Sequence, residues 1–382
     1  MTIAFAGQCC DAETYLRIGK ACATTAASCW TPLRPIGAAL YFSVPYRLGL
    51  PPETLVVMNL LLVAASIVGC WRAFSVLCAK ATVVGRLVPA GIAVLAHLFF
   101  MAVPAWNSLS DVPAAALALL GIWLLILGGA RRRVWYHATA GSALGAAVLV
   151  RASYLYPAFL AAAVCLAASV VLKRQRRSAL ALFLALGVSV GVQFYATHGR
   201  TGEWSFLDRT TTGRWERRHF GSTMYGRDTL LPGSAAEYTA PECFRTARDP
   251  FDAVRAHDWA AIACLWTRRQ EFYFGSYVSA GRVYLSSRSK RHFSEGFLFL
   301  NGAALLLGAF FAFSAHRRKS TSVPLVLVAT IWAQATAIVP ESRFLMVPHV
   351  VLWVLALSAI SELASQHNPW REDRPISSSD AT

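Results

Sequence analysis

The chain contains little charge, and acidic residues are the scarcer kind. Charged residues occupy 15% of its 382 positions, with 36 Lys and Arg against 20 Asp and Glu. Hydrophobic residues occupy 56% of the positions and occur in long blocks. A soluble fold of this length would need an implausibly large dry core. The composition therefore predicts an all-α, polytopic membrane protein.

Several motifs of metal and nucleotide chemistry are missing. The nine histidines form no HExxH or other ligand spacing, which argues against a histidine metal site. The chain has no Walker motif, no GxGxxG before a strand and no EF-hand loop. Nucleotide-driven transport therefore has no support. The net charge of +16 comes from short basic clusters between apolar blocks, which favours membrane topology and lipid phosphates over nucleic acid as its explanation.

The nine cysteines include no CxxC pair. Three of them fall in apolar blocks and serve as small hydrophobic residues, namely Cys70, Cys78 and Cys165. The other six fall in segments that we place outside the cytoplasm: Cys9, Cys10, Cys22, Cys29, Cys243 and Cys264. A disulfide can form there, but the spacing does not identify its partners.

The stretch from Ala105 to Trp135 sets the orientation. A polar loop is followed by an apolar run long enough to cross the bilayer and then by Arg131, Arg132 and Arg133. Basic residues gather on the cytoplasmic side of short loops. The end with Asp111 is therefore predicted to face outward, in an inner membrane protein whose site faces out of the cytoplasm.

Alternation from this segment predicts about nine membrane segments. Their expected ranges are 54–78, 87–104, 109–130, 137–150, 154–172, 178–197, 295–315, 323–339 and 344–363. The chain then divides into an extracytoplasmic acidic loop with an interfacial helix (1–53), an N-terminal transmembrane module (54–198), an extracytoplasmic loop (199–293), a C-terminal transmembrane module (294–363) and a cytoplasmic tail (364–382).

Residues 1–53 contain no run that spans a bilayer, and the first residues are too short for a signal peptide. Placing them outside therefore requires a preceding transmembrane helix, or later helices that pull the segment across.

Three acidic residues are candidates for catalysis, each with a plainer explanation. Asp11 and Glu13 precede the amphipathic stretch Leu33–Leu50, where a carboxylate could take a proton or hold a metal. They also suit an ordinary solvated segment. Asp111, in SLSDVP, suits simple helix-start chemistry with Ser110 because it meets the positive end of the helix dipole.

Two arginines are candidates for binding phosphate. Arg151 lies at an outer turn, and Arg343 opens the last membrane segment beside Glu341. A guanidinium grips phosphate through two hydrogen bonds. Snorkelling to lipid headgroups, or for Arg343 an internal ion pair with Glu341, explains these residues equally well.

Five motifs, taken in order, resemble the GT-C superfamily of multi-pass glycosyltransferases. They are DAETYL, RPIGAALYFSVPYRLG, NSLSDVPAAALALLGIWLL, GSALGAAVLVRASYLYP and ESRFLMVPHVVLWVLAL. The resemblance is to the branch of dolichyl-phosphate-mannose protein mannosyltransferases and bacterial aminoarabinose transferases, glycosyltransferase family 39. Members of that family normally carry a transmembrane helix ahead of the acidic loop.

The resemblance implies a transferase that moves a sugar from a polyprenyl-phosphate donor to a glycan, lipid or protein acceptor, usually with inversion. Asp11 matches the essential acidic residue of the first outer loop, with Glu13 as its alternative, and Asp111 matches the acidic residue of the second. Arg343, Arg151 and Tyr15 are assigned to the donor phosphate by the same resemblance. Some members use a divalent cation and others do not, so the cofactor stays open.

Two other classes of function compete with this interpretation. A lipid-sugar flippase would need polar groups along a path through the bilayer, often with paired repeats. No such repeat is visible, and the charged residues cluster at the outer ends of the segments. A non-catalytic membrane assembly protein is the third hypothesis, and it would tolerate Asp11→Asn.

Overall fold

The computed structural model describes residues 11–79, 81, 83–101, 110–171, 173, 175–211, 253, 255–264, 266–267, 299–311, 318–338 and 345–366. Arg343, Glu341 and most of the predicted outer loop lie outside these ranges. The backbone of Asp11 is described, but its side chain is not.

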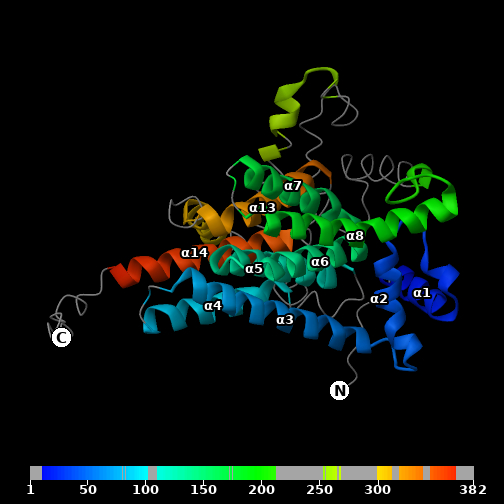
Figure 1. Ribbon diagram of the computed structural model, residues 1–382, viewed down its shortest axis with the longest axis horizontal. Helices are drawn as coiled ribbons and strands as arrows, with labels where there is room; N and C mark the ends of the chain where they lie inside the picture. The colour runs from blue at the N-terminus through cyan, green and yellow to red at the C-terminus, as the bar shows by residue number, and fades with distance from the viewer. Residues whose placement is uncertain are drawn as a thin grey trace, which may run out of the picture.

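Regular structure in the described residues is helical throughout (Figure 1). The α-helices are α1 (Asp11–Thr24), α2 (Ile36–Arg47), α3 (Thr54–Leu77), α4 (Val83–Met101), α5 (Asp111–Arg131), α6 (Val134–Val150), α7 (Leu155–Val171), α8 (Arg176–Thr201), α13 (Arg318–Ile338) and α14 (Met346–Gln366). Two short 3-10 helices are η1 (Ala26–Cys29) and η3 (Ala152–Tyr154). The predicted all-α class is confirmed for these residues.

Five helices are long and apolar enough to cross a membrane: Thr54–Leu77, Asp111–Arg131, Ala152–Val171, Arg176–Thr201 and Met346–Leu363. Four shorter apolar helices coincide with the other predicted segments: Gly85–Met101, Val134–Val150, Phe299–Phe311 and Thr321–Gln334. Several long apolar helices make this a membrane protein. For the four shorter helices the crossing stays a prediction.

Helix α5 forms the centre of the bundle. It packs against α3, α6, α13 and α14. Of the residues in its 18-residue apolar segment, 78% are buried within the protein. The outer helices have the opposite pattern. Only 28% of the residues in the 18-residue apolar segment of α8 are buried, and Val188 is 72% exposed. Apolar side chains on the outside suit contact with lipid.

The GxxxG of Gly141 and Gly145 joins α6 to α8. A Cβ at Gly141 would collide with the carbonyl oxygen of Leu182, and one at Gly145 would collide with Ser189. The two helices therefore pack closely, as is typical of this motif. Both contacts advance along the two helices in the same direction, so α6 and α8 run parallel.

The N-terminal helices α1 and α2 lie at one end of the molecule, and the C-terminal end of α14 lies at the other (Figure 1). Tyr15 is 3% exposed and stacks on Phe42 of α2, with ring centroids 4.9 Å apart. A Cβ at Gly19 would collide with the Phe42 backbone, which shows how closely the helices approach. Tyr15 and Gly19 are therefore packed into the protein, whereas Glu13 on the same helix is exposed.

A disulfide between Cys22 and Cys29 closes the link between α1 and η1. Both cysteines are buried, and Nη2 of Arg47 donates to the Cys22 carbonyl at 3.1 Å. Cys264 is also disulfide-bonded. Cys70, Cys78 and Cys165 are free, as expected for cysteines in apolar blocks.

The far end of α8 is tied to the segment that precedes α2. Gln193 is fully buried; its Oε1 accepts the N–H of Ile36 at 2.7 Å, and its Nε2 donates to the Phe206 carbonyl at 2.9 Å. Nη2 of Arg200 donates to the Ala27 carbonyl at 2.9 Å. These bonds fix the loop that carries Arg34.

Candidate functional site

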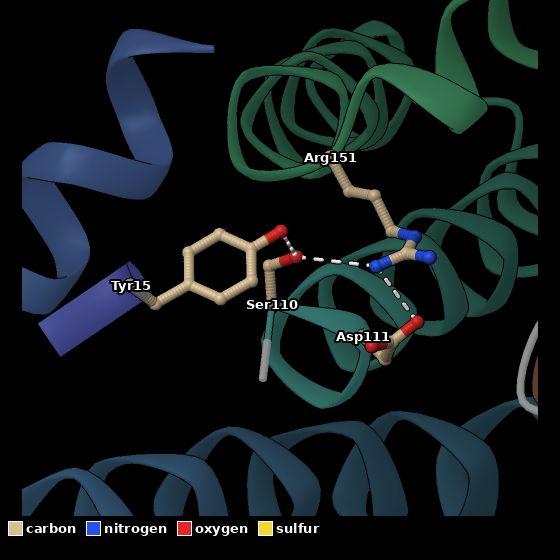
Figure 2. A network of polar contacts seen from close by, with 4 residues as sticks. All are labelled: Tyr15, Ser110, Asp111 and Arg151. Carbon is tan, nitrogen blue, oxygen red and sulfur yellow. Dashed lines mark hydrogen bonds and ion pairs between the residues drawn. The ribbon is translucent and has the colours of Figure 1, made fainter. Parts of the chain in front are cut away.

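Four polar side chains meet where α1 touches the start of α5 (Figure 2). Ser110 Oγ donates to the hydroxyl of Tyr15 at 2.7 Å and accepts from Nη1 of Arg151 at 3.2 Å. The same Nη1 lies 2.8 Å from Oδ1 of Asp111. Three of the candidate residues named from the sequence, Tyr15, Asp111 and Arg151, therefore form one network through Ser110.

The α5–α6 hairpin positions the ion pair. Asp111 begins α5, and Arg151 follows the last residue of α6 in an extended conformation (φ −147°, ψ 116°). The tight basic turn between the helices brings these distant ends of the sequence together. Two apolar helices of similar length around a short turn were the signal for this contact, which the sequence analysis did not use.

Ser110 has a role other than the one predicted. It occupies the N-cap position of α5, but its side chain makes no capping hydrogen bond within the described residues. Its hydroxyl joins Tyr15 to Arg151 instead. Asp111 does lie in the first turn, where the helix dipole favours a carboxylate.

The ion pair is largely removed from solvent. The side chains of Arg151 and Asp111 are 15% and 4% exposed. Removing two charges from water is costly, and a close partner with added hydrogen bonds offsets much of that cost. Arg151 thus has an internal partner within reach, which the hypothesis of simple snorkelling to headgroups did not include.

Arg34 is a site residue that the sequence analysis missed. Its Cζ lies 5.1 Å from the centroid of the Tyr15 ring, a distance typical of a cation–π contact. The backbone N–H of Arg34 donates to Oγ1 of Thr31 at 3.1 Å, which shapes the loop. A basic residue directly before the proline that opens an interfacial helix was the available signal.

Of the remaining predicted residues, only Glu13 has a described side chain. Glu13 is exposed on α1. Asp11 is the first residue of the same helix, one turn before Tyr15, and Arg343 lies outside the described residues. The described part of the chain gathers no group of three His, Cys, Asp or Glu that could hold a metal ion.

Comparison with family models, curated proteins and solved structures finds no match to this chain. The arrangement itself offers two guanidinium groups, those of Arg34 and Arg151, at either end of the Tyr15–Ser110 link. Guanidinium groups favour phosphate and carboxylate oxygens. The site is therefore suited to an anion at this end of the bundle.

Proposed function

We propose that the protein is a membrane glycosyltransferase that moves a sugar from a polyprenyl-phosphate donor to an acceptor outside the cytoplasm. The observation that carries the proposal is the network at one end of the bundle. It joins Tyr15, Asp111 and Arg151 from three distant parts of the chain, with the guanidinium of Arg34 over the Tyr15 ring. The resemblance of the sequence motifs to GT-C enzymes supports the same activity.

The chemistry assigned to the arginines is electrostatic. Transfer breaks the bond between the anomeric carbon and the phosphate oxygen, so negative charge grows on the departing lipid phosphate. Guanidinium groups fixed before the reaction stabilise that charge without reorganising. Asp111 is 4% exposed and paired, which favours a role in holding Arg151 in place over a role as proton acceptor.

The proton acceptor in the proposal is Asp11. A carboxylate near the acceptor hydroxyl takes its proton as the new bond to the anomeric carbon forms. Asp11 begins α1 and stands four residues before Tyr15. Positions at this spacing share one face of a helix, whereas Glu13 stands two residues before Tyr15 and does not.

The outward orientation of the site is part of the proposal, as are the inner membrane and the nine crossings. Two observations support the orientation. The disulfide Cys22–Cys29 joins η1 to α1, the helix that carries Tyr15, and disulfides persist in oxidising compartments. The arginines 131–133 lie at the other end of α5, and basic residues mark the cytoplasmic side.

The test measures sugar transfer in proteoliposomes that contain the full chain and a panel of labelled polyprenyl-phosphate sugars. The double variant Asp111→Asn/Arg151→Gln replaces the ion pair by two neutral amides, which avoids a buried unpaired charge. We expect it to fold and to lose at least about 100-fold in turnover, because one preorganised electrostatic group contributes on that scale.

Arg17→Gln is the matched control, since it removes an exposed positive charge from α1. It should keep the wild-type rate. Equal turnover by the double variant and the control would contradict the assigned site. A folded wild-type protein with no turnover on any donor would favour the flippase or the assembly protein.

A further inference from the structure

Two turns rich in basic residues lie at the end of the bundle opposite the site. One joins α5 to α6 and comprises residues 131–133, and the other leads from α7 into α8 and comprises residues 173–177. We call these segments the basic turns. Their described basic residues are all exposed: Arg131, Arg132, Arg133, Lys173, Arg176 and Arg177.

The basic turns lie side by side because α6 and α8 run parallel. The contact between Gly141 and Leu182 falls about two helical turns after the start of each helix. Val134 and Arg176, the first residues of α6 and α8, are therefore at nearly the same level. The two short segments form one surface.

The helices that carry this surface contain one acidic residue, Asp111, which lies at the opposite end of α5. The sequence contains no Asp or Glu between Asp111 and Glu203. Within the described residues, the side chains of Arg132, Arg133 and Arg177 make no hydrogen bond or ion pair. Like charges held this close repel one another, so an anion from outside would stabilise them.

The backbone of both turns is strained. Arg132, Lys173 and Gln175 adopt left-handed conformations, with φ values of 55°, 50° and 53°. Such a conformation costs a residue with a side chain about 1–2 kcal/mol, whereas glycine adopts it freely. Strain of this kind often accompanies ligand clamps.

Exposed apolar side chains adjoin the charges. Val170 and Val171 are 54% and 78% exposed at the end of α7, and Trp135 is 51% exposed at the start of α6. The Trp135 ring stacks on Tyr136 with centroids 3.7 Å apart. A ligand that matches this surface has an anionic head beside an apolar body. Phospholipid has both parts, whereas free phosphate and a soluble acidic protein lack the second.

We propose that the basic turns bind the phosphate headgroups of anionic phospholipids, with Trp135, Val170 and Val171 against the acyl chains. This site is separate from the Arg151 network, because the two lie at opposite ends of α5 and α6. The inference does not depend on sugar transfer.

The experiment is native mass spectrometry of the purified full chain in micelles that contain equal amounts of phosphatidylglycerol and phosphatidylcholine. The wild type should retain phosphatidylglycerol preferentially. The triple variant Arg132→Gln/Arg133→Gln/Arg177→Gln should lose about tenfold or more of this preference, because each basic residue near a lipid surface contributes about fivefold. The preference of the wild type should also weaken as salt is added.

The matched control Arg17→Gln/Lys20→Gln/Arg209→Gln removes three exposed charges from the other end and should leave the preference unchanged. The triple Arg→Lys variant at the basic turns should also keep it. Equal retention of both lipids by the wild type would overturn the proposal, as would an equal loss in the control. Competition by inorganic phosphate or polyglutamate as strong as that of the lipid would overturn it too.

Discussion

The two ends of the α5–α6 hairpin carry charge in opposite ways. At one end Asp111 and Arg151 are paired, largely buried and bonded through Ser110 to Tyr15. At the other end Arg132 and Arg133 are exposed and share one sign. The paired charges hold their side chains in a fixed geometry, whereas the exposed arginines create a positive electrostatic potential at the surface. Removing one charge should therefore affect folding at the first end and mainly lipid contact at the second.

The largest effect is expected from Asp111→Ala. The substitution leaves the guanidinium of Arg151, which is 15% exposed, without its carboxylate. Breaking such a pair costs about 3–5 kcal/mol. Reversible unfolding in mixed micelles should show this loss, whereas Arg132→Ala should stay within about 0.5 kcal/mol of the wild type. Equal losses of stability in Asp111→Ala and Arg132→Ala would contradict the difference between the buried pair and the exposed arginines.

The double variant Cys22→Ser/Cys29→Ser should have the second largest effect on stability. The disulfide constrains the unfolded chain, so its loss should lower the free energy of unfolding by about 2–4 kcal/mol. Unfolding of the reduced and oxidised protein measures the change. Cys165→Ala, at a free cysteine, is the control: it keeps the bridge, so reductant should destabilise it as much as it destabilises the wild type. A maleimide that labels Cys22 in the untreated wild type would show that the bridge is absent.

Gly141→Ala tests the close packing of α6 against α8. The added methyl group meets the backbone of Leu182, which cannot rotate away, so overpacking should cost about 1–3 kcal/mol. Gly187→Ala in α8 is the matched control because its Cβ would meet open space. That change should be neutral or stabilising by up to about 1 kcal/mol. Similar melting curves for the two variants would contradict the close α6–α8 contact.

Tyr15→Phe should have the smallest effect. It removes one acceptor from the hydroxyl of Ser110, and a buried hydrogen bond contributes about 1 kcal/mol. A double-mutant cycle with Ser110→Ala isolates this bond, and a coupling energy near zero would show that the network is not formed. The cation–π contact with Arg34 survives in this variant because the ring remains.

Local sequence predicted the helices better than it predicted the site. Long apolar runs identify α3 and α5, since a bilayer imposes their length. The spacing of Gly141 and Gly145 is likewise typical of the close helix contact that they form. Both signals lie within a single segment, so no tertiary information is needed to find them.

The site depends on contacts between segments. The pairing of Asp111 with Arg151 needs the hairpin to close, and the contact between Arg34 and Tyr15 needs α1 to dock on α2. Cys22 and Cys29 had several candidate partners, so their pairing was not readable from spacing. Side chains far apart in sequence meet only when helix packing is known.

The burial of α5 has a consequence for biogenesis. Its side chains are hydrophobic enough for the segment to enter lipid alone, yet 78% of the residues in its apolar segment are buried inside the folded protein. Insertion must therefore come first, and neighbouring helices must then displace lipid from its surface. Within α5 the requirements for entering the bilayer and for packing are separable. Trp123 of α5 is fully buried, so a Trp123→Leu variant should insert normally and assemble poorly.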